Sequence, residues 1–195
     1  IPQAELDYLI AERTFRIAPC VIHHADIGDR GTMKYIMRRH NIEIVIHLAS
    51  FPRQRVVNSN PCWGSQTMSE GLLSLLEASK LNHVRKFVYV SSSMVYGNFK
   101  DSYNEGIDEN HTCNPIGQYG IMKLAGEWLT RDYTRRGCFD HVIIRPSAVY
   151  GEYDVEDRVV SKFMLGAMRG ETLKVKGANE VLDFTYVEDA AMGIA

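Results

Sequence analysis

Three short segments of the sequence carry residue types that could act together on an alcohol. They follow one another at residues 91–97 (Ser-Ser-Ser-Met-Val-Tyr-Gly), 119–123 (Tyr-Gly-Ile-Met-Lys) and 145–151 (Arg-Pro-Ser-Ala-Val-Tyr-Gly). The first offers the Ser92 hydroxyl, and the second offers the Tyr119 phenol and the Lys123 ammonium group. A phenol that has lost its proton can deprotonate an alcohol, which is the first step of its oxidation. The segments therefore predict Ser92, Tyr119 and Lys123 as candidate catalytic residues.

The spacing of Tyr119 and Lys123 suits this chemistry if both lie on a helix, because residues four apart share one face. A free tyrosine has a pKa of about 10, and a tyrosine that acts as a base at neutral pH needs a pKa about 3 units lower. A neighbouring ammonium group supplies part of that shift. The same spacing recurs at Tyr96 and Lys100, but Gly97-Asn98 favours a turn there. For Tyr119 alone, a half-buried helix aromatic is the alternative interpretation.

The composition is that of an ordinary globular domain. The chain has 195 residues, of which 45% are hydrophobic and 24% are charged, and its net charge is -2. This charge balance does not favour a nucleic-acid-binding protein, and the apolar stretches have the length of strands rather than of membrane spans. The four cysteines lack metal-ligand spacing, and His23-His24 has no partner at such spacing. We therefore expect free thiols, no metal site and a cytoplasmic protein.

Apolar and amphipathic segments alternate along the chain. They predict strands over 19–26, 42–49, 85–92 and 141–146, and helices over 32–40, 67–80, 118–136 and 159–169. Such alternation is typical of a parallel sheet covered by helices on both faces. Ligands of these sheets bind at the carboxyl ends of the strands, where the chain has Asp26, Ala49-Ser50 and Ser91-Ser92. The long polar connection over 98–117 is expected to be a functional loop or lid.

Together the segments resemble the extended short-chain dehydrogenase/reductase family, and within it the nucleotide-sugar epimerases and dehydratases. The matching pieces are 25–29, 45–49, 71–78, 91–97, 119–123, 145–151 and 182–189. The resemblance implies an α/β fold, a Rossmann-like parallel sheet flanked by helices, with NAD as cofactor. The Gly-x-x-Gly-x-x-Gly turn of the family is not in the sequence. We therefore expect residues 1–195 to form a partial NAD-binding domain that lacks the first βαβ unit and most of the C-terminal substrate lobe, which would begin within 155–195.

The resemblance also implies roles for individual residues. It makes Ser92, Tyr119 and Lys123 catalytic, with Tyr119 and Lys123 also at the cofactor, where Lys123 would hold the nicotinamide ribose. The other implied cofactor residues are Asp26 and Ile27 at the adenine, Leu48, Ala49 and Ser50 along the pyrophosphate and ribose, and Pro146 and Ser147 beside the nicotinamide. The implied substrate residues are Ser92, Ser93 and Ala148.

The implied reaction is the epimerisation of a nucleotide sugar through a 4-keto intermediate. Tyr119 would remove the proton of a sugar 4-hydroxyl while hydride passes from C4 to NAD, and the hydride would return to the other face of the 4-keto sugar. Related 4,6-dehydratases carry an Asp-Glu pair where this chain has Ser93 and Met94. The resemblance therefore favours an epimerase over a dehydratase.

Two further interpretations stay open. Ala148 stands where the family often has Asn, and Leu182 where it often has an Arg that contacts phosphate; both favour a reductase or dehydrogenase that acts on a non-sugar substrate. The absent glycine turn favours a non-catalytic binding or dimerisation module. For the enzyme we expect a nucleotide-sugar substrate, no nucleic-acid or membrane partner, and a homodimer through the helices near 67–80 and 118–136.

Overall fold

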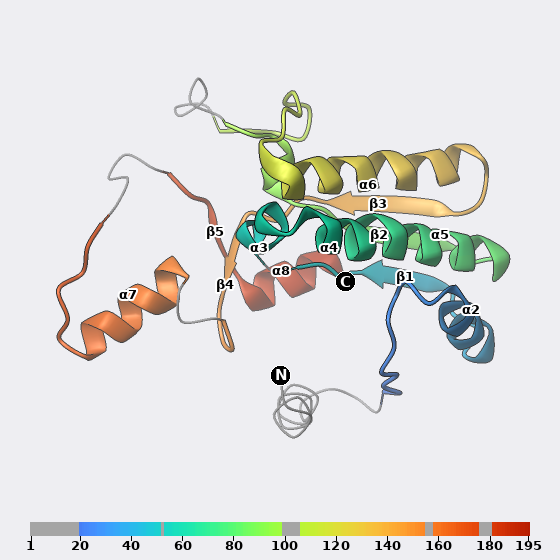
Figure 1. Cartoon of the computed structure of the whole chain (residues 1–195), viewed down its shortest axis with the longest axis horizontal. Helices are drawn as coiled ribbons and strands as arrows, with labels where there is room; N and C mark the ends of the chain where they lie inside the picture. Colours follow the sequence, from blue (N-terminus) through green and yellow to red (C-terminus); the bar gives the residue numbers. More distant parts are fainter. Residues whose placement is uncertain (1–19, 52, 99–105, 155–157, 176–180) are drawn as a thin grey trace.

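The computed structural model of the chain describes residues 20–51, 53–98, 106–154, 158–175 and 181–195. Its centre is a three-stranded parallel sheet in the order β1-β2-β3 (Figure 1). The strands are β1 (Ile44–His47), β2 (Lys86–Val90) and β3 (Asp140–Ile144). The strands expected over 42–49, 85–92 and 141–146 and the Rossmann-like α/β architecture are thus confirmed.

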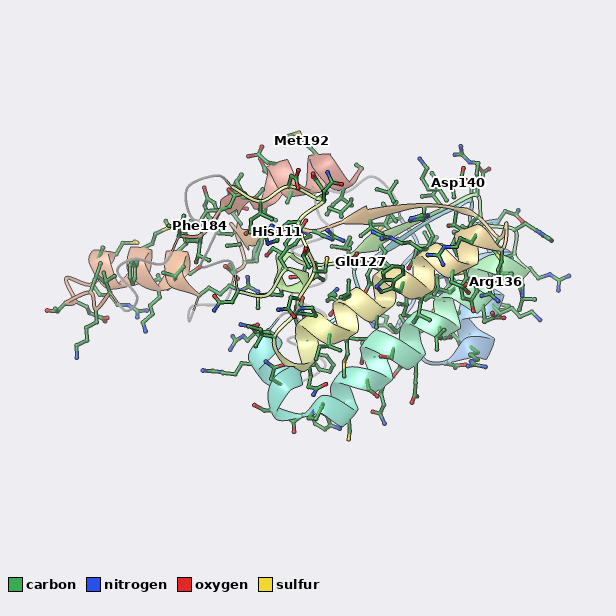
Figure 2. The ribbon with its side chains drawn as sticks, turned by 90° about the horizontal axis from the view of Figure 1, so that it is seen from above. His111, Glu127, Arg136, Asp140, Phe184 and Met192 are labelled. Carbon is green, nitrogen blue, oxygen red and sulfur yellow. The ribbon has the colours of Figure 1, made fainter. Side chains whose placement is uncertain are left out.

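Three helices pack on this sheet: α2 (Arg30–Arg39), α5 (Leu72–Leu81) and α6 (Gly117–Arg135). Figure 2 shows α5 and α6 side by side on one side of the strands. The helices and strands share one apolar core, made of Met33, Met37, Val45, Leu72, Leu75, Leu76, Ala78, Val84, Phe87, Tyr89, Tyr133 and Phe139. The helices expected over 32–40 and 118–136 are confirmed. None of the helices in the described ranges is long and apolar enough to cross a membrane.

Helices flank the sheet as expected, but in the described part of the chain one face of the sheet is partly exposed. Side chains of β1 alternate between exposed and buried, as a pleated strand requires. On the exposed side, Ile44, Ile46 and Val142 are 45%, 44% and 40% exposed. These side chains point away from the core under α2, α5 and α6, and no other described element buries them.

The strand expected over 19–26 is wrong in its described part. Residues 20–26 are irregular backbone, and Val21 and Ile22 are 67% and 46% exposed. Their apolar run predicted a buried strand, but a strand is stable only beside a hydrogen-bonded neighbour. Within the described chain β1 pairs with β2 alone, and residues 20–26 do not pair with its outer edge.

Between β1 and α5 the chain forms three short elements: α3 (Gln54–Ser59), α4 (Pro61–Ser65) and a π-helical turn over Gln66–Gly71. The helix expected over 67–80 is therefore regular only from Leu72 onward. Both α3 and α4 pack against α6. They meet closely at Gly64, where a Cβ would lie 2.6 Å from Cγ1 of Val57. Helices this short show no apolar period, so no sequence pattern predicted them.

Smaller elements lie beyond the carboxyl ends of β1 to β3 (Figure 1). A 3₁₀ turn, η2 (Ser93–Val95), follows β2. Strands β4 (Ala148–Tyr150) and β5 (Phe184–Tyr186) pair in parallel, with α7 (Val159–Met168) between them in sequence and α8 (Val187–Ile194) after them. The helix expected over 159–169 is thus confirmed.

The start and the end of the connection over 98–117 lie in close contact. Gly97 has a φ of +79°, and a Cβ there would collide with the carbonyl oxygen of Asn114. Both the dihedral angle and the close approach require glycine. Residues 99–105 lie outside the described residues, so the role of a lid stays a prediction.

Candidate active site

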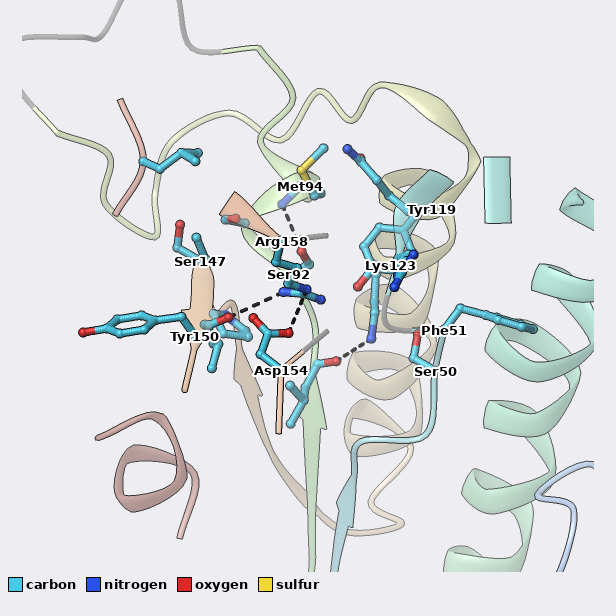
Figure 3. A pocket seen from close by; sticks show the side chains of 18 of the residues that line it. Ser50, Phe51, Ser92, Met94, Tyr119, Lys123, Ser147, Tyr150, Asp154 and Arg158 are labelled. Atoms are coloured by element: carbon cyan, nitrogen blue, oxygen red, sulfur yellow. Dashed lines mark hydrogen bonds and ion pairs between the residues drawn. The ribbon is translucent and has the colours of Figure 1, made fainter. Parts of the chain in front are cut away.

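A cavity of about 640 Å³ opens at the carboxyl ends of β1 and β2, beside the start of β4 (Figure 3). It brings together nine residues that were assigned to the site from sequence: Leu48, Ser50, Ser92, Ser93, Tyr119, Lys123, Pro146, Ser147 and Ala148. Three other assigned residues, Asp26, Ile27 and Ala49, are described but do not line it. Asp26 and Ala49 are exposed, and Ile27 lies against Gly71.

The backbone beyond β2 runs beside the backbone beyond β3, and this joins two segments of the site. The amide of Ser91 donates a hydrogen bond of 2.7 Å to the carbonyl oxygen of Ile144, and the amide of Ser93 donates one of 3.0 Å to that of Pro146. Between these two bonds Ser92 is extended, and its Oγ caps η2. The ends of two strands therefore place Ser92 beside the segment that begins at Pro146.

Helix α6 presents Tyr119 and Lys123 to the cavity because its first turn packs closely on η2. A Cβ at Gly120 would lie 2.7 Å from the carbonyl oxygen of Met94, so a glycine is needed for this approach. The residue before the helix is an isoleucine and supplies no side-chain cap. Instead Oδ1 of Asn58, in α3, accepts a hydrogen bond of 3.1 Å from the amide of Tyr119.

Lys123 is almost completely buried, with 4% of the residue exposed. Its Nζ donates a hydrogen bond of 2.7 Å to the carbonyl oxygen of Val90. The same atom lies 5.9 Å from the centroid of the Tyr119 ring. Burial lowers the pKa of Lys123 to about 8, so the ammonium form still predominates at neutral pH. The side chain therefore places a positive charge at the inner end of the cavity, close to Tyr119.

Burial raises the pKa of the Tyr119 phenol above its usual value. Three neighbours act in the opposite direction, namely the hydroxyl groups of Ser92 and Ser50 and the positive charge of Arg158. The Ser50 hydroxyl is buried and has no partner at good hydrogen-bonding geometry among the described residues. Since burial prevails, the phenol is protonated at neutral pH, and it needs a further positive charge in the cavity to become a base.

The cavity also holds side chains that were not identified from sequence, among them Phe51, Tyr150 and Arg158. Nε of Arg158 lies 3.3 Å from Oδ1 of Asp154, and Nη1 donates a hydrogen bond of 3.5 Å to the carbonyl oxygen of Val149. Figure 3 shows Arg158 and Asp154 paired on the β4 side of the cavity.

Comparison with protein families identifies the group of proteins to which the chain is related. A model of the NAD dependent epimerase/dehydratase family matches residues 6–195. The chain belongs to this family. The resemblance to epimerases and dehydratases seen in the sequence segments is thereby confirmed.

Individual members of the epimerase/dehydratase family are similar to the chain in sequence and in structure. UDP-glucuronate 4-epimerase of Thermodesulfobacterium geofontis (strain OPF15) is 28% identical over 172 residues, which are 88% of this chain and 52% of that protein. The structure of UDP-N-acetylglucosamine 4-epimerase from Methanobrevibacter ruminantium M1 in complex with UDP-N-acetylmuramic acid matches with a TM-score of 0.81 and 26% identity, over 89% of this chain and 56% of that one. The structure of UDP-glucuronic acid 4-epimerase from Bacillus cereus in complex with UDP-glucuronic acid and NAD matches with a TM-score of 0.82 and 25% identity, over 97% and 59%. The chain thus spans about half the length of these relatives.

The cavity has polar groups that suit the cofactor after which the epimerase/dehydratase family is named. The buried Ser50 Oγ has no partner at good hydrogen-bonding geometry within the described ranges, so it is available to bond a ligand. The Lys123 ammonium group has three N–H donors, and one of them is bonded to Val90. Pro146 and Ser147 line the same cavity. The Ser50 hydroxyl and the Lys123 ammonium group suit a ligand that carries hydroxyl groups, such as the ribose of NAD.

Proposed function

We propose that this chain forms the nicotinamide and sugar part of the active site of an NAD-dependent nucleotide-sugar epimerase, which acts through a 4-keto intermediate. The observation that carries the proposal is that Ser92, Tyr119 and Lys123 line one cavity at the carboxyl ends of parallel strands, where ligands of such sheets bind. The three relatives described above are 4-epimerases of UDP-sugars, which supports the same reaction class and a nucleotide-sugar substrate.

The cofactor in this proposal is held by residues of the cavity and of the neighbouring loops. When bound, NAD supplies an acceptor for hydride from a sugar carbon and a positive charge on its ring. We assign the nicotinamide, ribose and pyrophosphate to Leu48, Ala49, Ser50, Tyr119, Lys123, Pro146 and Ser147, and the adenine to Asp26 and Ile27. The assignments of Ala49, Asp26 and Ile27 rest on the resemblance alone, because these residues lie outside the cavity.

Tyr119 is the base in the proposed reaction. Its phenolate takes the proton of the sugar 4-hydroxyl and returns it when the 4-keto group is reduced. The Lys123 ammonium group, 5.9 Å from the ring, favours the phenolate. The Ser92 hydroxyl holds the same sugar oxygen and passes the proton. Because burial raises the pKa of Tyr119, the phenol loses its proton only when a cationic ligand adds its charge to that of Lys123.

The residues beside Ser92 favour an epimerase over a dehydratase. Ser93 and Met94 line the cavity, and neither has a carboxyl group that could assist the loss of water. The second candidate, a dehydrogenase or reductase of a non-sugar alcohol, is favoured by Leu182, which lines the cavity where the family often has an arginine. Arg53 and Arg55 also line it, so positive side chains that suit a diphosphate are present.

We also propose the homodimer expected through the helices near 67–80 and 118–136, and we extend its surface to α4, which packs against α6. Trp63, Ile121 and Trp128 are 63%, 46% and 54% exposed, and the two helices that carry them pack against each other. Large exposed apolar side chains that gather on one face mark interaction surfaces. Sedimentation of the chain would show a dimer that the Trp128→Glu substitution converts to a monomer. A cytoplasmic location stays a prediction.

Calorimetric titration of the chain with NAD, followed by an assay of UDP-hexose conversion, tests the proposed enzyme. We expect micromolar affinity for NAD and formation of the 4-epimer. Bound NAD that is reduced by a simple alcohol, with no change of the UDP-hexose, would support the dehydrogenase instead. A chain that binds no NAD at millimolar concentration would contradict the proposal and support a non-catalytic module.

A further inference from the structure

Glu127 lies behind the cavity and has no part in the reaction proposed above, yet only 1% of it is exposed. A buried carboxylate is costly unless it is paired and hydrogen-bonded, so its partners are informative. Oγ of Ser91 donates a hydrogen bond of 2.6 Å to Oε1 of Glu127. Arg145 donates two more, from Nε to Oε1 (2.9 Å) and from Nη2 to Oε2 (2.7 Å).

These bonds join the segments that carry the candidate catalytic residues. Ser91 directly precedes Ser92 at the end of β2, and Arg145 directly follows β3. The remaining Nη1 of Arg145 donates to the hydroxyl of Tyr96 (2.9 Å) and to the carbonyl oxygen of Glu109 (3.1 Å). One carboxylate of α6 is therefore bonded to the ends of two strands and, through the guanidinium group, to the loop beyond η2.

Helix α6 packs so closely on the sheet that it has little room to shift. A Cβ at Gly126 would collide with the Tyr89 ring, so α6 lies almost against the side chains of β2. Close packing of this kind fixes the distance between helix and sheet. The bidentate ion pair of Glu127 with Arg145 also restricts the orientation of the helix. On α6 the residues Tyr119, Lys123 and Glu127 are spaced by four and share one face, so a shift at Glu127 moves the other two.

We propose that Glu127 is a positioning residue which, with Ser91 and Arg145, holds α6 so that Tyr119 and Lys123 face Ser92. That this positioning matters for turnover rests on the proposed function. That it determines where the Tyr119 and Lys123 side chains lie is independent of that function. A purely structural role would have a different signature. It would lower the fraction of folded chain and leave each folded molecule unchanged at Tyr119.

Two substitutions and one control separate these roles. Ser91→Ala removes one hydroxyl and leaves the Glu127–Arg145 pair, whereas Glu127→Gln removes the charge and keeps the shape. The control, Ser79→Ala, removes a buried hydroxyl that bonds to the carbonyl oxygen of Leu75 in α5 (2.7 Å) and to Sδ of Met37 in α2 (4.0 Å), on elements that carry none of the candidate catalytic residues. The first readout is the NMR spectrum of the chain with ¹³C-labelled tyrosine rings, in which Tyr119→Phe identifies the Tyr119 signal.

We expect Ser91→Ala and Glu127→Gln to shift or broaden the Tyr119 signal, and Ser79→Ala to leave it in place. With NAD and UDP-hexose, turnover per bound NAD should fall about tenfold to 100-fold in both variants, with KM and NAD affinity within about twofold of the unaltered chain.

If the unaltered chain converts no sugar, the proposed function fails, and the NMR signal of the Tyr119 ring still tests the positioning role. If Glu127→Gln does not fold, Ser91→Ala decides. A folded variant whose Tyr119 signal and turnover match those of Ser79→Ala would overturn the inference.

Discussion

Nζ of Lys123 donates a hydrogen bond of 2.7 Å to the carbonyl oxygen of Val90, the last residue of β2. The helix that carries the candidate base is thus tied, inside the cavity, to the strand that leads to Ser92. A hydrogen bond from a charged donor is stronger than one between neutral groups. The bond keeps the ammonium group near the Tyr119 ring, where its charge favours the phenolate.

Lys123→Met removes this charge and keeps a side chain of similar length. We expect the variant to fold, to bind NAD more weakly and to lose turnover by about 100-fold or more, because a positive charge 5.9 Å from the centroid of the Tyr119 ring is lost. Turnover per folded chain at saturating substrate is the measurement. Lys80→Met, at the exposed end of α5, is the control and should behave like the unaltered chain. Equal turnover of the two variants would refute the role of Lys123.

Protonation of the buried His47 ring makes the stability of the folded chain depend on pH. It is 4% exposed and stacks on Tyr89, with 5.7 Å between the ring centroids. Burial, followed by the charge of Lys123, lowers the pKa of His47 from 6.5 to about 4. Between these two pH values the unfolded chain binds a proton that the folded chain does not, so the folded state loses stability as the pH falls through this range. The stabilisation present above pH 6.5 and lost near pH 4 is on the order of 3 kcal/mol.

Urea unfolding at neutral pH and near pH 4 measures this effect. His47→Phe keeps an aromatic ring and binds no proton, so its free energy of unfolding should fall less with pH than that of the unaltered chain. His83→Gln, at an exposed position, should retain the full dependence. A His47→Phe chain that loses stability as steeply as the unaltered one would show that other groups cause the effect.

Asn58 caps α6 from outside the helix, because its Oδ1 accepts the hydrogen bond from the amide of Tyr119. We expect Asn58→Ala to cost about 0.5–1 kcal/mol of unfolding free energy and to lower turnover, since the turn that carries the base loosens. Asn58→Asp should retain both properties, because a carboxylate is favoured at a helix N-terminus. Asn60→Ala is the matched control, since the Asn60 side chain makes no capping bond to α4. Urea titration and turnover would contradict this account if the two alanine variants behaved alike.

The central part of the site could be predicted from sequence because its signals are local. Tyr119 and Lys123 share a helix face by their spacing alone, and Ser92 follows an apolar run of strand length. The positions where parallel strands end lie at one edge of a sheet, so these residues had to lie near one another. No local sequence pattern marks Arg158 or Asn58, because each acts on Tyr119 only in the folded chain. The uncapped isoleucine before α6 was the one local sign that a partner such as Asn58 was needed.

The errors in the fold have a related cause. The apolar run at Val21 and Ile22 shows that a strand could form, but the run does not reveal whether the segment will pair with the free edge of β1. Strands β4 and β5 have three residues each, which is too few to show alternation.

The claim that Tyr119 is the base is tested most directly by turnover of UDP-hexose in the Tyr119→Phe chain, measured together with its affinity for NAD. The substitution keeps the ring and removes only the hydroxyl that would take the proton. The account predicts that turnover falls by about 1,000-fold or more while the chain still binds NAD. A Tyr119→Phe chain that binds NAD and turns over as fast as the unaltered chain would contradict it.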